Sequence, residues 1–414
     1  MPKGMKDYYP EEKAVREKMY ATFKARAKAY GFQEVEMPVM ETVENLTAKS
    51  GPDKKEQIFL LEKRSNEQLG LRFDLTIPMT RLFVAKQKEL PKPVKWFCVD
   101  KNWRYEAPQK GRLREFYQFG VEVFGSESPR VDAEVINLVI DCMQAFGLTE
   151  KEVIMKVNSR KLLEGLLASY VSPKQMVDVI RAIDRAAGED QETLKKELKG
   201  IGIENDEVVK LAQIKGSMQE VASQIANCDI TEEGKEELEK LKQACALLPK
   251  AWVEVDLGLA RGLDYYTGIV FEAFDRAGEL RALAGGGRYD ALTSLLGGED
   301  TPATGFGFGI LPFSIYLEEK GLVPKTGFVI EYFVAPVDEA VVPEAFRITE
   351  KLRKKFNVEV DLAGRKLSKQ FEYAASIGAK KVIVVGSRDL EKGLVTVRDL
   401  AKGKEEQVKV EDLG

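Results

Sequence analysis

Residues 94–125 read VKWFCVDKNWRYEAPQKGRLREFYQFGVEVFG, and this stretch carries two strand patterns joined by a short basic loop. The first pattern is VKWFCVDKNWRYE, the second is REFYQFGVEVFG, and the loop between them is APQKGRL. The sequence therefore predicts a long β-hairpin.

The two faces of this hairpin differ in chemistry, because successive side chains of a strand point to opposite faces. Tyr117, Phe119, Val121 and Val123 share one face, which is typical of a hydrophobic core. The opposite face is mostly polar and holds Asn102, Arg104, Glu106, Arg114, Phe116, Gln118, Gly120 and Glu122.

The residues alone leave two interpretations of this polar face open. Burying its charges costs several kcal/mol each unless partners exist, so it is either a solvated face with cross-strand Arg–Glu pairs or a ligand site. A nucleotide fits the second interpretation, since an arginine can fork onto phosphate oxygens and an aromatic ring can stack on a base. Lys110 and Arg112 in the loop are placed to meet either phosphates or a nucleic-acid end.

The sequence before the hairpin predicts a helix over residues 11–29 and a strand that runs to Pro38. A second strand is predicted over 69–78, and a helix follows over roughly 79–88. Asp74 and Thr76 lie two apart on the predicted second strand and would therefore share a face.

The sequence after the hairpin predicts several domains. We predict a first domain in two parts, 1–159 and 249–323, separated by a Lys/Glu-rich helical insertion at 160–248. Beyond a linker, residues 327–414 alternate between strand and helix patterns, which predicts a small α/β domain with a mainly parallel or mixed sheet.

Composition excludes several classes of function. The 414 residues include no histidine, which removes a Ser-His-Asp triad, a histidine base and any histidine-ligated metal. No CxxC pair is present, so a zinc ribbon is not expected. Catalysis would have to rest on charge and positioning, with Mg²⁺ held by carboxylates as the metal chemistry still open.

Location and partners are bounded by charge and hydropathy. No run of eighteen apolar residues is found and the N-terminus is charged, so we expect no membrane span and a cytoplasmic protein. The net charge of −4 means that a nucleic-acid site would be a local basic patch on an acidic body.

Three peptides carry a specific resemblance. RYEAPQKGRLREFYQFGVEVFG at 104–125 resembles motif 2 of the class II aminoacyl-tRNA synthetases in its histidine-specific form. LARGLDYYTGIVFE at 259–272 and AGGGRYDAL at 284–292 are similar to the two signature peptides of histidyl-tRNA synthetases. The likeness covers nearly the whole chain in the right order.

The resemblance implies an α+β catalytic domain with an antiparallel sheet, a helical insertion over the tRNA acceptor stem and a C-terminal α/β anticodon-binding domain. It also implies ATP-dependent ligation of L-histidine to tRNA(His) through a histidyl-adenylate, with Mg²⁺ whose ligands stay unassigned. The helix at 11–29 and the strand ending at Pro38 are similar to motif 1, which forms the dimer interface in the family, so a homodimer is expected. Periodicity alone leaves an ordinary core helix as the alternative for 11–29.

The resemblance also implies roles for single residues toward ATP. Arg104 and Arg261 would face the α-phosphate from two sides, and Arg112 would lie near the outer phosphates. Phe116 would stack on adenine, and Glu106 would belong to the same ATP site.

Histidine would be bound by a second group of residues. Asp74 and Thr76 would hold its α-amino group, Gln118 and Arg261 its carboxylate, and Glu122 its imidazole. Tyrosines complete this group, with Tyr266 on the imidazole, Tyr289 close by, and Tyr265 either a ligand contact or a core residue.

Recognition of the tRNA end is carried by the motif 2 loop in the family. Gln109 is in place for this contact, whereas Ala107 stands where many members have an arginine. Its mode of end recognition is therefore left open.

A second departure concerns motif 3, which in class II synthetases ends in an arginine that clamps the ATP γ-phosphate. Here TGFGFGILPFSIYL has Leu311 and Pro312 where Glu-Arg is expected. Either Arg112 and Mg²⁺ hold the nucleotide tail, or another cation does, or the chain binds ligands without activating them. Proline would also disturb the following helix unless it lies in the first turn.

The alternative to a ligase is a non-catalytic paralogue that regulates the first enzyme of histidine biosynthesis. Such paralogues usually lack the anticodon-binding domain and an intact RGLDYYTG peptide, and both are present here. The same peptide speaks against a synthetase for proline or threonine.

Overall fold

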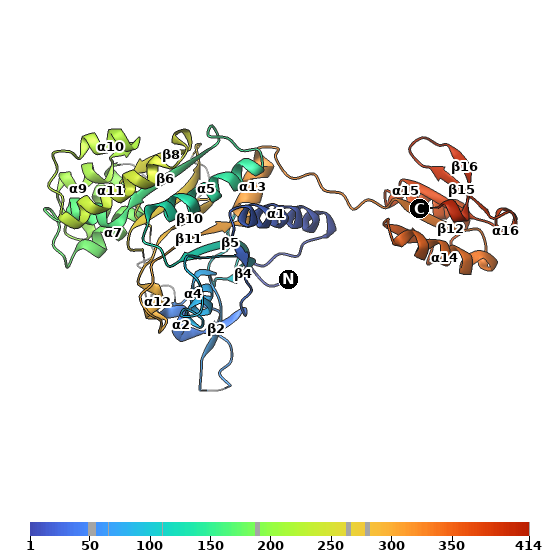
Figure 1. Ribbon diagram of the computed structural model, residues 1–414, viewed down its shortest axis with the longest axis horizontal. Coiled ribbons are helices and arrows are strands. Elements are labelled where there is room, and N and C mark those ends of the chain that lie inside the picture. Colours follow the sequence, from blue (N-terminus) through green and yellow to red (C-terminus); the bar gives the residue numbers. More distant parts are fainter. Residues whose placement is uncertain are drawn as a thin grey trace. The chain divides into compact units, whose positions relative to one another are not determined.

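The protein divides into two compact units, Met1–Lys325 and Thr326–Gly414, in a computed structural model (Figure 1). The structure describes residues 1–48, 55–64, 66–109, 111–186, 191–261, 266–277 and 282–413.

A nine-stranded sheet forms the centre of the described part of the first unit, in the order β1-β4-β5-β11-β10-β9-β6-β8-β7. Neighbouring strands are antiparallel except at β1/β4 and β6/β8, which confirms the predicted antiparallel fold class. The strands are β1 (Gln33–Glu34), β4 (Val94–Trp103), β5 (Glu115–Phe124), β6 (Val153–Ser159), β7 (Lys215–Gly216), β8 (Val253–Asp256), β9 (Ile269–Asp275), β10 (Ala284–Arg288) and β11 (Ala303–Gly309).

The predicted hairpin is formed by β4 and β5, which pair with Asn102 opposite Phe116 and Trp96 opposite Glu122. Its apolar face is buried as predicted, with Phe119 and Val121 both in the main hydrophobic core. The alternation of polar and apolar residues therefore predicted correctly which face of the hairpin packs into the core.

Helices cover both faces of the sheet (Figure 1). Helices α1 (Pro10–Ala29), α5 (Pro129–Ala145) and α13 (Ile310–Glu319) bury the apolar side of the hairpin and of β11. Helices α4 (Thr76–Val84) and α12 (Leu292–Leu295) lie on the other side, next to a smaller core. A separate two-stranded sheet of β2 (Met40–Thr42) and β3 (Leu69–Leu71) adjoins the short helix α2 (Val43–Thr47).

The segment 69–78 is not the continuous strand that the sequence predicts. Strand β3 ends at Leu71, and α4 already begins at Thr76. Asp74 accepts a hydrogen bond from the Ile77 amide (3.1 Å) just before α4, whose N-cap residue is Leu75. The predicted strand placement of Asp74 and Thr76 is therefore wrong, because the chain has left β3 before Asp74 and has entered α4 at Thr76.

Residues 160–248 are mostly helical in the structure, and these helices gather at one end of the sheet (Figure 1). A two-residue strand, β7, interrupts them and pairs with β8 at the sheet edge. The helices are α6 (Arg160–Leu167), α7 (Met176–Arg185), α8 (Gln191–Gly200), α9 (Asp206–Ala212), α10 (Met218–Gln224) and α11 (Glu232–Ala246).

The second unit has a mixed five-stranded sheet in the order β13-β12-β14-β15-β16. The first three strands of this order are parallel to each other, and the last two are added antiparallel. Its elements are β12 (Tyr332–Pro336), α14 (Val342–Arg353), β13 (Val358–Val360), α15 (Leu367–Ser376), β14 (Lys381–Val385), α16 (Ser387–Leu390), β15 (Leu394–Asp399) and β16 (Glu405–Lys409).

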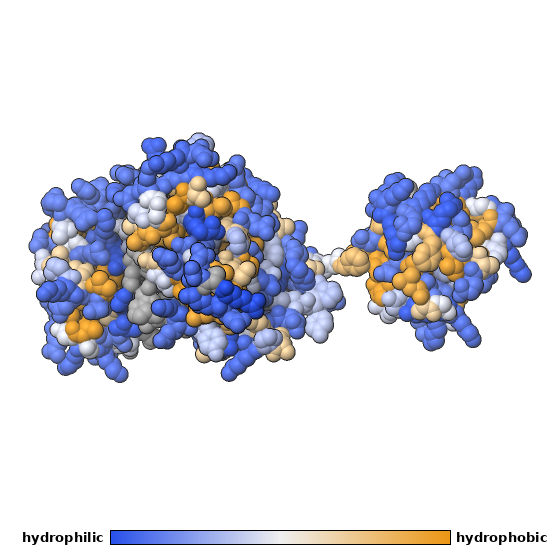
Figure 2. Space-filling model, turned by 90° about the horizontal axis from the view of Figure 1, so that it is seen from below, coloured by the Kyte–Doolittle hydropathy of each residue, from blue (hydrophilic) through white to orange (hydrophobic). Residues whose placement is uncertain are grey.

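The visible face of each unit is mainly hydrophilic, with smaller hydrophobic areas between (Figure 2). Within the described ranges, we find no helix that combines the length and the apolarity needed to cross a bilayer.

Phe23 on α1 ties the helix layer to the sheet. Its ring centroid lies 5.1 Å from that of Phe119, 4.9 Å from Phe308 and 5.9 Å from Phe313, and the side chain is fully buried.

Phe23→Ala should lower the free energy of unfolding of the first unit by about 3–5 kcal/mol, because it leaves a cavity among rings. Denaturant unfolding measures this; Phe328→Ala, at a side chain 74% exposed, is the control and should change stability little. A loss below about 1 kcal/mol at Phe23 would contradict the aromatic anchor.

Candidate functional site

The polar face of the hairpin opens into a pocket of the first unit. Most of the residues expected to bind histidine or the α-phosphate come together here, from the hairpin, the start of α4 and the glycine-rich strands. The lining consists of Phe73, Asp74, Thr76, Arg104, Gln118, Arg261, Tyr266, Gly285, Tyr289, Gly305, Phe306 and Gly307.

Glu122 lies behind this lining and is fully buried. Its carboxyl accepts a hydrogen bond from the Thr76 hydroxyl (2.6 Å) and another from the Tyr289 hydroxyl. Burial raises the pKa of Glu122 to about 8, and the two hydroxyl donors only partly oppose this. Burial thus favours the protonated form of this carboxyl group.

Glycines make the room in which the polar side chains lie. A Cβ atom at Gly305 would overlap the Glu122 carboxylate, and one at Gly307 would overlap the Gln118 amide. A Cβ at Gly285 on β10 would overlap the Arg261 guanidinium in the same way. The sheet therefore has a glycine at each of the three positions where one of these polar side chains lies against its backbone.

Arg104 is held at the end of β4. Its Nε donates to the Phe73 carbonyl (3.0 Å), and its guanidinium carbon lies 4.9 Å from the centre of the Phe116 ring. A cation and an aromatic face thus lie next to each other at one side of the pocket.

Arg261 enters from the segment after β8. Its Nη1 lies 3.5 Å from Glu272 and 3.4 Å from the Phe271 carbonyl, and its guanidinium carbon is 5.2 Å from the centre of the Tyr266 ring. Burial raises the pKa of Glu272, although the Arg261 charge opposes the shift. Tyr265, predicted as a ligand contact or a core residue, lies outside the described residues.

Three predicted residues of the hairpin loop do not line the pocket. Arg112 forms an ion pair with Glu106, and the Gln109 and Arg112 backbones bond to each other at 3.1 and 2.9 Å. The second carboxyl oxygen of Glu106 is buried and has no hydrogen-bond partner among the described residues. A buried acceptor of this kind fits a donor supplied by a ligand.

Pro312 is the third residue of α13 and so lies in its first turn, where a helix does not need the missing amide. The helix therefore tolerates the proline without distortion. The Pro312 Cβ lies 3.9 Å from the position that a Cβ on Gly111 of the hairpin loop would take. An apolar contact thus occupies the place at which the resemblance predicts an arginine.

Five lining residues were not among those that the sequence predicted. The signal for the glycines was present, because Gly305 and Gly307 alternate with Phe306 and Phe308, and a strand with this pattern has one bare face. Nothing local marks Phe73, which contributes its carbonyl.

Within the described ranges, no group of three or more cysteine or acidic side chains is placed to hold a metal ion.

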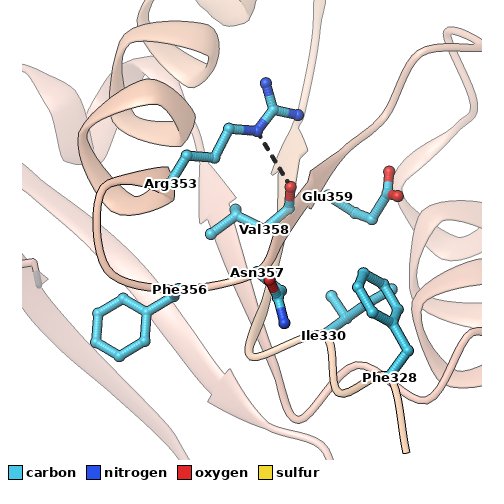
Figure 3. A pocket seen from close by; sticks show the side chains of 7 residues that line it. All are labelled: Phe328, Ile330, Arg353, Phe356, Asn357, Val358 and Glu359. Atoms are coloured by element: carbon cyan, nitrogen blue, oxygen red, sulfur yellow. Dashed lines mark hydrogen bonds between the residues drawn. The ribbon is translucent and has the colours of Figure 1, made fainter. Parts of the chain in front are cut away.

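A second hollow lies in the second unit, beside strand β13 (Figure 3). Two of its polar side chains bond to backbone, since Arg353 donates to the Val358 carbonyl (3.3 Å) and Asn357 to the Val329 carbonyl (3.1 Å). It lacks the converging charges of the first pocket. Its lining is Phe328, Ile330, Arg353, Phe356, Asn357, Val358 and Glu359.

Comparison with known proteins accounts for the whole chain. The family model for histidyl-tRNA synthetase matches residues 4–312, and the model for an anticodon binding domain matches residues 331–414. The chain belongs to the histidyl-tRNA synthetase family. A histidine–tRNA ligase of Pyrococcus furiosus is 38% identical over 421 residues, which is 99% of this chain and 96% of that protein. A chloroplastic/mitochondrial histidine–tRNA ligase of Arabidopsis thaliana is 37% identical, over 100% of this chain and 85% of that protein.

Solved structures agree with this fold. A histidyl-tRNA synthetase from Nostoc sp. PCC 7120 superposes with a TM-score of 0.79 at 24% identity, covering 100% of this chain and 98% of that chain. A Bacillus halodurans protein described as an ATP phosphoribosyltransferase regulatory subunit/histidyl-tRNA synthetase has a TM-score of 0.76 at 24% identity, over 93% and 97% of the two chains. Fold similarity alone therefore does not separate ligase from regulator.

The raised pKa of Glu122 predicts a dependence of stability on pH. In the folded state Glu122 has a pKa of about 8, against 4.5 for an ordinary glutamate. Between these pH values the folded protein holds a proton that the unfolded chain has lost, so the free energy of unfolding falls as the pH rises. Relative to Glu122→Gln, the wild-type free energy of unfolding should fall by about 1.4 kcal/mol per pH unit in that window and level off above it. Parallel curves for the two proteins, from denaturant unfolding over a pH series, would disprove the assignment.

The bare sheet predicts a sharp effect of a single methyl group. Gly307→Ala should displace the Gln118 amide and weaken binding of the amino-acid substrate about tenfold or more, since the methyl overlaps that side chain. Isothermal titration with histidine measures this. Gly200→Ala is the matched control, because its added Cβ meets no atom within 4 Å. Equal affinities in both variants would refute the role of Gly307.

Proposed function

We propose that this pocket is the active site of a histidine–tRNA ligase, which activates L-histidine with ATP and transfers it to tRNA(His). The observation that carries the proposal is the convergence of Arg104 and Arg261, from separate parts of the chain, on a pocket that also holds Gln118. The family match over both units supports tRNA charging as the overall activity.

In the first step, a carboxylate oxygen of histidine attacks the α-phosphorus of ATP, and the bond to pyrophosphate breaks. Both reactants are anions, so the barrier is largely repulsion and developing charge on the phosphorus oxygens. Arg104 and Arg261 supply fixed positive charge from two sides of the reacting atom. The carboxylate needs no base, which suits a chain without histidine.

Histidine is selected by its three polar groups. Asp74 and Thr76 hold the α-amino group, and Gln118 with Arg261 binds the carboxylate. The imidazole lies against Tyr266, and its ring N–H donates to Glu122 by replacing one of the two hydroxyl partners. This donation favours the ionised form of Glu122, which the empty pocket disfavours.

ATP binds along the hairpin. The adenine stacks on Phe116, and its amino group donates to the buried free oxygen of Glu106. Arg112 turns from Glu106 toward the outer phosphates, since Pro312 offers no charge there. Mg²⁺ enters with ATP as part of the substrate, and no step here is assigned to it.

In the second step, the terminal ribose hydroxyl of tRNA attacks the carbonyl carbon of the adenylate, and AMP leaves. We assign residues 1–159 and 249–323 to the catalytic domain and 160–248 to an insertion over the acceptor stem. Residues 327–414 then bind the anticodon, in line with the match to that domain family. Gln109 in the hairpin loop contacts the tRNA 5′ end.

The remaining assignments are a homodimer, formed through α1 as motif 1, and a cytoplasmic location. The rival function, a regulatory subunit of histidine biosynthesis, has less support. Histidine–tRNA ligases are 35–38% identical to this chain across nearly its full length. The Bacillus halodurans protein described as a regulatory subunit/histidyl-tRNA synthetase is 24% identical, the same value as the Nostoc synthetase.

The purified protein should catalyse histidine-dependent exchange of pyrophosphate into ATP, and Arg261→Ala should slow this exchange about 10²–10³-fold while the fold persists. Radiolabelled pyrophosphate measures the rate, and circular dichroism checks the fold. Arg276→Ala, on the exposed surface, is the control and should keep most of the activity. Absence of exchange in the wild type, at adequate Mg²⁺, would sink the ligase proposal.

A further inference from the structure

Residues 257–261 follow β8 and residues 266–268 precede β9, and these two stretches, together called the substrate-binding segment, carry Arg261 and Tyr266 of the pocket. Both ends contact the helical region 160–248, which the proposed function assigns to tRNA.

The first end rests on the short strand β7. The Leu257 amide donates to the Ile214 carbonyl (2.9 Å), directly after the β7/β8 pairing of Lys215 with Asp256. A Cβ on Gly258 would overlap the carbonyl of Ala212 at the end of α9. The backbone of the segment thus touches the backbone of the helical region with no side chain between them.

The last residue of the segment, Gly268, is fixed through β6 and α11. The Arg160 amide donates to the Gly268 carbonyl (2.9 Å), and the neighbouring Ser159 hydroxyl donates to Glu237 of α11 (2.9 Å). Glu237 is buried, and its second oxygen accepts from Lys240 (2.8 Å). The same Glu237 carboxylate lies 3.5 Å from the position that a Cβ on Gly268 would take.

Asn158 connects the two ends. Its amide donates to the carbonyls of Leu257 (3.2 Å) and Leu259 (3.0 Å), and its own oxygen accepts from the Ser159 amide (2.8 Å). A shift of α11 is therefore transmitted through Ser159 and Asn158 to the residues that precede Arg261.

We propose that the helical region positions the substrate-binding segment, with Glu237 as a positioning residue for histidine activation. Glu237 touches no substrate and acts by holding Ser159 and the Gly268 end. This inference rests on the proposed function, because it concerns the placement of Arg261 and Tyr266 around histidine. It makes the helical region part of the activation machinery as well as a surface for RNA.

The test is pyrophosphate exchange with the full-length protein, measured over separate series of histidine and ATP concentration. Glu237→Ala should lower kcat/KM for histidine about tenfold or more, with a raised KM for histidine and an ATP KM within about twofold of wild type. The ATP KM changes little because Arg104, Phe116 and Arg112 hold ATP from the hairpin, whereas displacement of Arg261 from the α-phosphate lowers kcat. Glu237→Gln keeps an acceptor for Ser159 and should restore most of the activity.

Two further variants keep the test decisive. Ser159→Ala removes only the hydroxyl donor and should shift the histidine KM in the same direction, even if Glu237→Ala fails to fold. Glu239→Ala, on the same helix but paired with Lys242 at the surface, is the matched control and should behave as wild type.

The outcomes separate the inference from the function it rests on. A wild type without exchange refutes the proposed function itself. The positioning role is overturned if the wild type is active but the Glu237 and Ser159 variants keep its KM for histidine. It is also overturned if these variants lose only kcat, through a smaller folded fraction. A histidine-specific KM effect, rescued by Glu237→Gln, supports it.

Discussion

The site depends on one packing constraint. Its polar side chains lie directly against the sheet backbone, at positions where any residue larger than glycine would overlap them. Strand β11 meets this constraint by alternation, since Phe306 and Phe308 fill the core on one face and Gly305 and Gly307 leave the other face bare. The bare face gives Glu122 and Gln118 space beside the backbone. Core packing and the pocket thus use opposite faces of the same strand.

Electrostatics follows from this arrangement. Glu122 is buried between two hydroxyl groups, so its pKa is raised, and a further hydrogen-bond donor to its carboxylate would lower it. Arg104 donates to the Phe73 carbonyl, and Arg261 lies beside the Phe271 carbonyl and the Glu272 carboxylate. The pocket therefore presents a neutral acid at one place and positive charge at another, which suits an imidazole and an adenylate in turn.

The outer part of the site differs from the inner part in rigidity. Arg112 is paired with Glu106, so binding of a polyphosphate must exchange one partner for another. Arg261 is placed by a segment whose ends are bonded to β6, β7 and, through Ser159, α11. The chain has no histidine that could act as a general acid or base. Catalysis would therefore depend on where the charged side chains are held.

The sequence by itself determined the antiparallel hairpin, its two faces and the family, because period-two alternation and the peptides at 104–125 and 259–272 are local features. It placed Asp74 and Thr76 at the site but on the wrong element, since the apolar alternation of 69–78 does not record that the chain leaves β3 at Leu71 and enters α4 at Thr76. The tertiary structure alone decided which groups share the pocket and how Glu237 reaches Ser159 across 78 residues of sequence. Contacts of that range depend on how the sheet and the helical region pack, and no local periodicity records them.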